Sequence, residues 1–258
     1  MSRLMQTTLR TIAGGFELEG SDVDAALAEL FGVGVRPLRF ELALFEKVLE
    51  GWRFQQSARN LAVSTKHDRE RLVRRAVREL ERWPWDWRPL HVEEWFDDFA
   101  IRGAKRSTRR GYQVTLCMFL DYLTDRRYPW SAICARELGK RPVQVFDDLN
   151  LMRHLDEYEA DPSKRPLTEE ELHEFFAFAD AEFERRRSLG RKGVLTAFRD
   201  TVIFKTLYAW GLRANEGTMA NVVDFHRSAQ APEFGRFGVL VVRHGKGAHG
   251  SGPRRREI

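Results

Sequence analysis

Hydrophobic side chains return every three or four residues over several long stretches of this chain, which is the spacing of one face of an α-helix. In the first half, the segments with this spacing are 40–61, 65–83, 92–99 and 108–123. Ser64 or Thr65 is suited to cap the second helix, which Pro84 ends, and Ser107 or Thr108 is suited to cap the fourth. Helices joined by such short connections predict a compact four-helix bundle.

The pattern is interrupted between residues 126 and 165, where prolines and charges break up one short helical stretch. Because such a segment lacks apolar residues for a core of its own, it predicts a linker between two domains. The residues before it divide into an N-terminal arm, 1–37, and a helical domain, 38–125. The residues after it, 166–258, predict a second domain.

The second domain begins with Thr168, and Glu171 follows three residues later. In this pattern, the capping box, the side chain of each residue accepts a hydrogen bond from the backbone N–H of the other at the start of a helix. Phe175, Phe176 and Phe178 lie in this helix, and we expect them to be buried in the core of the second domain. A second helix over 195–210 would end at a glycine, Gly211, in the left-handed conformation. Strands then follow at 239–242 and 254–258, around a glycine-rich turn at 245–253. The expected fold class is therefore mainly α, with one small antiparallel β-hairpin.

Composition supports folded domains and offers little sign of cofactors. The 258 residues are 43% hydrophobic and 12% aromatic, and Trp83, Trp85 and Trp87 are expected to pack in the core and in a turn. No apolar run approaches the ~20 residues of a membrane span. Cys117 and Cys134 lack metal-ligand spacing. We therefore expect a cytoplasmic protein with no membrane partner, no metal and no other cofactor.

Positive charge gathers in two places that suit the DNA backbone. The net charge is +5, from 43 Lys and Arg against 38 Asp and Glu. The first cluster, which contains no acid, is Arg102, Lys105, Arg106, Arg109 and Arg110. The second lies opposite the apolar stripe of the 65–83 helix and is Arg71, Arg74, Arg75 and Arg78. A solvated helix face is the alternative interpretation, above all for the second cluster.

The stretch 199–225, RDTVIFKTLYAWGLRANEGTMANVVDF, resembles the first conserved block of tyrosine recombinases, the phage-integrase family. Residues 165–171 resemble the entry into the family's catalytic domain, and 241–247 resemble its β-hairpin lysine turn. Residues 107–123 are similar to its N-terminal DNA-clamping domain, the core-binding or SAM-like bundle. The resemblance thus covers residues 40–258 and is strongest at 195–225.

This resemblance implies roles for three residues. Arg213 would hold two oxygens of a DNA phosphate, because its guanidinium is planar and always charged. Glu216, three residues later, would brace that guanidinium. Lys246, at the glycine-flanked tip of the hairpin, would protonate the leaving 5′ oxygen as a general acid. A site-specific integrase of this kind cleaves and rejoins duplex DNA through a phosphotyrosyl intermediate. It would be associated with the nucleoid, and its full-length form would assemble as a tetrameric synapse.

The chain departs from the family's second block. That block reads His-x-x-Arg and precedes the nucleophilic tyrosine, but none of the seven histidines has Arg three residues on. The last tyrosine, Tyr208, lies within a predicted helix and is expected in the core. The sequence therefore predicts a catalytically incomplete DNA-binding fragment, truncated within the catalytic domain. A non-catalytic DNA-binding regulator that competes for recombination sites is the alternative, and a structural helical protein is a third.

Overall fold

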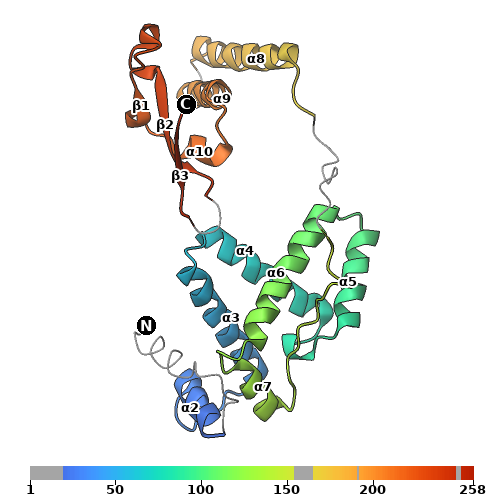
Figure 1. Ribbon diagram of the computed structural model, residues 1–258. Helices are drawn as coiled ribbons and strands as arrows, with labels where there is room; N and C mark the ends of the chain where they lie inside the picture. Colours follow the sequence, from blue (N-terminus) through green and yellow to red (C-terminus); the bar gives the residue numbers. More distant parts are fainter. Residues whose placement is uncertain (1–19, 154–164, 191, 248–250) are drawn as a thin grey trace. The chain divides into compact units, whose positions relative to one another are not determined.

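A computed structural model describes residues 20–153, 165–190, 192–247 and 251–258 (Figure 1). The protein is mainly helical and has one three-stranded antiparallel sheet, which confirms the expected class. It divides into two compact units, residues 1–160 (unit 1) and 161–258 (unit 2). Over the ranges that are described, no helix has the length and apolar character needed to cross a membrane.

Unit 1 is built from helices around one core. Its elements are α2 (Gly20–Phe31), α3 (Phe40–Ala58), α4 (Val63–Leu80), the 3-10 turn η1 (Pro84–Asp86), α5 (Pro89–Ile101), α6 (Arg106–Thr124) and α7 (Trp130–Leu138). The four predicted helices are present as α3 to α6. Their N-caps differ from the prediction, because Ala62 and Lys105 hold those positions and the expected Ser and Thr caps lie inside the helices.

Aromatic side chains fill the core of unit 1. Trp52 of α3 meets Phe119 of α6 edge to face, with 5.1 Å between the ring centroids. Trp85 and Trp87 are fully buried, as expected, and the Nε1 of Trp87 donates to the carbonyl of Arg82 over 3.0 Å. Helix α3 approaches this core closely at Gly51, where an added Cβ would lie 2.3 Å from the hydroxyl oxygen of Tyr122.

Parts of the predicted arm and linker belong to the core of unit 1 instead. In α2, Val23 and Ala26 are buried in this core, so residues 20–31 are part of unit 1 rather than of a separate arm. Within the expected linker, α7 buries Trp130 and Ile133 in the same core. The physical reason is that even a short helix with apolar residues three or four apart can cover a core. Residues 1–19 and 154–164 lie outside the described residues.

Unit 2 combines a helical pair with the small sheet. Its elements are α8 (Glu169–Ser188), α9 (Val194–Ala209), α10 (Ala214–Thr218), η2 (Val222–Asp224), β1 (Phe225–His226), η3 (Pro232–Phe237), β2 (Val239–Gly245) and β3 (Arg254–Glu257). The predicted capping box at the start of α8 is confirmed, since Thr168 accepts from the backbone of Glu171 and Glu171 accepts from that of Thr168.

The sheet has the order β1-β2-β3, with all neighbours antiparallel. Leu240 of β2 pairs with Phe225 of β1, and Val242 of β2 pairs with Arg256 of β3. The predicted hairpin is therefore present, with a bulge between Val242 and Gly245. This hairpin brings residues more than ten positions apart in the sequence to the same end of unit 2.

The helical pair of unit 2 leaves much apolar surface uncovered. Phe178 is 70% exposed and Tyr208 is 59% exposed, so the expectation that they belong to a core was wrong. Phe175 and Phe176 are only partly covered, by Phe204 and Tyr208 respectively. The reason is that α8 and α9 pack against each other, while α9 carries apolar residues on all its sides. In the described part of unit 2, the buried hydrophobic residues are Leu240 and Val242.

Candidate nucleic-acid interface

The chain turns sharply at the end of α9 and so presents Arg213. Gly211 has a φ of 55°, the left-handed conformation expected for it. Its N–H donates to the carbonyl of Tyr208 over 3.2 Å, and the N–H of Leu212 donates to that of Leu207 over 2.9 Å. This is the Schellman pattern that closes a helix at glycine. Two residues later Arg213 is the N-cap residue of α10, outside both helices.

Glu216 anchors Arg213 through both its backbone and its side chain. The side chain of Glu216 is 2% exposed, whereas that of Arg213 is 65% exposed. Glu216 accepts from the backbone N–H of Arg213 over 3.0 Å and from its Nη1 over 3.0 Å. The expected contact between these two residues is thus present. A buried carboxylate thus binds the backbone and one guanidinium nitrogen of an arginine whose side chain is mostly exposed.

A third residue shares this carboxylate. Arg256 of β3 donates from Nη2 to Glu216 over 2.8 Å. The pKa of Glu216 lies below its ordinary value because the backbone N–H of Arg213 donates to it, and the two guanidinium groups add to that effect against the opposing effect of burial. Glu216 is therefore ionised at neutral pH. The cluster Arg213–Glu216–Arg256 joins α10 to the hairpin.

A second buried carboxylate lies on the neighbouring turn. Asp224 accepts from Nη2 of Arg243 over 3.0 Å and from the backbone N–H of Asn221 over 2.8 Å. The Nε of Arg243 also lies 2.6 Å from Asp224, as an ion-pair contact without hydrogen-bond alignment. Burial opposes ionisation of Asp224, but these contacts outweigh it and hold its pKa below the ordinary value.

Lys246 directly follows β2 and has an exposed side chain. Its neighbour Gly245 is buried between the hairpin and α10. A Cβ built at Gly245 would lie 2.6 Å from the carbonyl oxygen of Arg254 and 3.6 Å from Oε1 of Glu216. The backbone next to Lys246 therefore lies beside the carboxylate that holds Arg213. The three residues that the resemblance singled out are gathered at one end of unit 2.

Four of the eight candidate DNA-binding arginines of unit 1 form ion pairs with acidic side chains. Arg75 lies 2.8 Å from Glu79, Arg71 lies 3.4 Å from Asp68, and Arg74 pairs with Glu46. Directly after α5, Arg102 lies 2.6 Å from Asp98. Arg78 is exposed on α4, and Lys105 and Arg106 are exposed around the start of α6. The basic surface is present, but ion pairs within unit 1 neutralise part of its positive charge.

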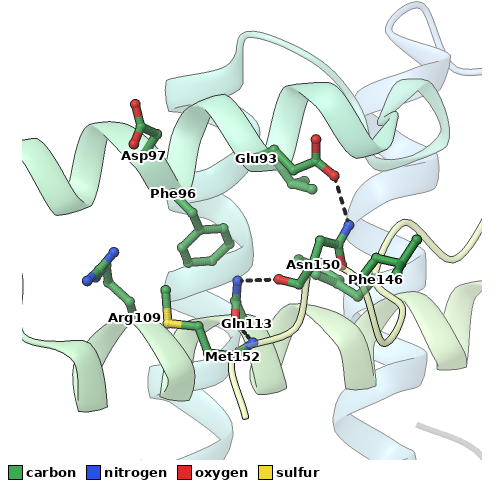
Figure 2. Close-up of a pocket in the computed structure, with 10 residues that line it drawn as sticks. Glu93, Phe96, Asp97, Arg109, Gln113, Phe146, Asn150 and Met152 are labelled. Carbon is green, nitrogen blue, oxygen red and sulfur yellow. Dashed lines mark hydrogen bonds between the residues drawn. The ribbon is translucent and has the colours of Figure 1, made fainter.

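Arg109 is placed differently from its neighbours, because it lines an open cleft of about 470 Å³ (Figure 2). Its Nε is buried and has no hydrogen-bond partner among the described residues. Glu93 and Asp97 line the same cleft, and Asn150 donates to Glu93 over 3.1 Å. Arg109 thus shares its cleft with two acidic side chains. The 102–110 stretch contains no acid in the sequence, but two acidic residues of α5 line the cleft beside Arg109 in the structure.

Comparison with protein-family models, with curated proteins and with solved structures found no match for this chain. The resemblance to tyrosine recombinases therefore rests on the quoted sequence motifs.

Sequence reasoning assigned no role to Arg243, Arg256 or Asp224. Their contacts cross between α10, the turn before β1 and the hairpin, and no helical or strand period joins such distant positions. The available signal was the run of three arginines at 254–256 directly after a glycine-rich turn. Pairing that run with β2 by alternation would have placed Arg256 on the face of Val242.

Proposed function

We propose that this chain binds duplex DNA through its phosphate backbone and is related to tyrosine recombinases. The observation that carries the proposal is the state of Arg213. Its side chain is 65% exposed, yet a buried carboxylate binds both its backbone N–H and its Nη1, and a hairpin with an exposed lysine lies alongside. Such an arrangement suits an anion that arrives from solvent.

The chemistry of Arg213 supports a phosphate ligand. An arginine carries five N–H donors in a rigid plane, and Arg213 uses one of them on Glu216. The others could form the two parallel hydrogen bonds that guanidinium groups make with phosphate oxygens. Because Glu216 orients the plane beforehand, little side-chain entropy would be lost on binding. In unit 1, α4 and the start of α6 would add non-specific contacts through Arg78, Lys105 and Arg106.

In a form that also carries the second conserved block and a nucleophilic tyrosine, the proposed activity is site-specific cleavage and rejoining of DNA. Arg213 would stabilise the negative charge that builds on the scissile phosphate. Lys246 would donate a proton to the leaving oxygen. Unit 1 would act as the core-binding domain that clamps the duplex, and copies of the protein would assemble on DNA.

A regulator that binds recombination sites without cutting them is the second candidate. It is favoured by the absence of His-x-x-Arg from the 258 residues and by the position of Tyr208. The ring of Tyr208 lies edge-on to Phe176, 5.5 Å away, within the helical pair of unit 2. Both candidates share the proposed phosphate contact at Arg213.

The test is binding to a fluorescent duplex, measured by anisotropy as salt is raised. If about six phosphates are neutralised, the log–log slope of affinity against salt is roughly −5. Arg213→Ala is expected to weaken binding and to make the slope shallower by about 0.9, which is one phosphate contact. Arg187→Ala is the matched control, because Arg187 pairs with Glu184 on α8, away from this cluster. Absence of duplex binding by the wild type at low salt would refute the proposal.

A further inference from the structure

We propose that Arg256 is a second phosphate-binding residue, and that Arg213 and Arg256 hold one phosphodiester group between them. This inference rests on the proposed function, because it assigns a further residue to the same site. It starts from the shared carboxylate. Oε1 of Glu216 accepts a hydrogen bond from Nη1 of Arg213 over 3.0 Å, and Oε2 accepts one from Nη2 of Arg256 over 2.8 Å.

The sharing places the two guanidinium groups within reach of one ligand. Since the two oxygens of a carboxylate are roughly 2 Å apart, the bonded nitrogens of Arg213 and Arg256 lie within roughly 8 Å of each other. A tetrahedral phosphate that bridges two guanidinium groups fits such a separation. The two arginines come from α10 and β3, so the fold rather than sequence proximity brings them together.

Both arginines keep donors for a ligand. The side chain of Arg213 is 65% exposed and that of Arg256 is 42% exposed, whereas Glu216 is buried beneath them. Each arginine uses one of its five N–H donors on Glu216. A phosphate above the carboxylate could therefore receive hydrogen bonds from both without breaking either existing contact.

The charges favour a phosphodiester over a phosphomonoester. The three side chains of the cluster, two guanidinium groups and one carboxylate, carry a net charge of one positive unit; Lys246, which is assigned to the leaving oxygen, is counted apart from them. A phosphodiester carries one negative charge and balances it, whereas a phosphomonoester carries about −1.5 to −2 at neutral pH. The cluster thus suits the backbone of a nucleic acid better than free phosphate.

The hairpin selects Arg256 from three consecutive arginines. Val242 of β2 pairs with Arg256, and paired residues of antiparallel strands lie on the same face of the sheet. Val242 is buried, so the face of Arg256 is the one that covers Glu216. Arg255 lies on the opposite face, because successive side chains of a strand alternate. Arg255 is therefore a control with the same charge at the neighbouring position.

The experiment counts phosphates with a double-mutant cycle. Duplex affinity is measured against salt for the wild type, Arg213→Ala, Arg256→Ala, the double variant and Arg255→Ala. If one phosphate is shared, each single variant makes the slope shallower by up to about 0.9, and the total change in the double variant is also no more than about 0.9. Independent phosphates would instead give a loss of about 1.8 in the double variant, which would overturn the inference.

Two further measurements keep the outcomes separate. If Arg256→Ala does not fold, Arg256→Lys replaces it. This variant keeps the positive charge but lacks the planar guanidinium, so we expect it to bind DNA with lower affinity than the wild type. Competition with inorganic phosphate at constant ionic strength distinguishes a site for the DNA backbone from a site for free phosphate. If millimolar inorganic phosphate displaces the DNA, the cluster is a free-phosphate site. If Arg256→Ala and Arg255→Ala both bind DNA with the affinity of the wild type, this inference is overturned and the proposed function is not. No wild-type binding overturns the proposed function as well.

Discussion

Replacing Trp130 with alanine tests whether the segment after α6 belongs to the core of unit 1. Trp130 is 1% exposed, and its ring lies 6.3 Å from that of Tyr122, between centroids. A Cβ added at Gly51 would lie 3.0 Å from Cζ2 of Trp130, so α3 packs directly on this indole. Little space remains around the side chain, and its loss would leave a cavity.

The expected cost follows from that burial. Truncating a buried tryptophan to alanine lowers the free energy of unfolding by about 3–5 kcal/mol. With a urea m-value of about 2 kcal/mol per molar, the unfolding midpoint of unit 1 falls by roughly 2 M. Tryptophan fluorescence suits the assay, because six of the seven tryptophans lie in unit 1.

The control lies in the same segment. Leu149 is 95% exposed, and Leu149→Ala is expected to change the free energy of unfolding by less than about 0.5 kcal/mol. A linker would tolerate both substitutions equally. A destabilisation by Trp130→Ala of less than about 1 kcal/mol would therefore show that the packing of α7 described above is wrong.

Three other predictions concern unit 2. The pKa values of Glu216 and Asp224 are lowered in the folded state, so their stabilising contribution is present above about pH 4 and is lost as the pH falls through the folded values; unfolding followed by circular dichroism should show this loss, and Asp224→Asn should reduce it. Phe178→Ser and Leu195→Gln remove exposed apolar surface, so binding of a hydrophobic dye should fall while the melting temperature changes by no more than a few degrees; unchanged dye binding would mean that these faces are covered. The 258-residue chain should form no covalent adduct with a nicked suicide duplex, because it lacks His-x-x-Arg; a shifted band on a denaturing gel that disappears with Tyr208→Phe would contradict this.

Local patterns predicted the parts of the fold that local physics determines. The helical periods of α3 to α6 and the capping box at Thr168 follow from contacts within a few residues. The left-handed turn at Gly211 is likewise local, because few other residues adopt that conformation without strain. The side-chain contact between Arg213 and Glu216 spans one helical turn and was predictable for the same reason.

The errors arose where tertiary packing decides. Helix α7 has only nine residues, and the prolines and charges around it suggested a linker, but Trp130 alone supplies a large buried surface. Conversely, Phe178 and Tyr208 have the composition of core residues, yet nothing in the described part of unit 2 covers them fully. The pairing of Arg256 with Glu216 depends on the hairpin register, which no short-range signal encodes.

The acidic neighbours of the arginines on α4 and directly after α5 alter what a salt titration of this protein would measure. Asp68, Glu79 and Asp98 act as built-in counterions for the arginines beside them. A phosphate that approaches such an arginine displaces a carboxylate that stays tethered nearby, and its negative charge retains cations from solution. Fewer ions are then released for each contact than with an unpaired arginine. A shallow salt dependence would therefore be compatible with a broad DNA footprint, and the footprint is better read from protection of the DNA than from the slope.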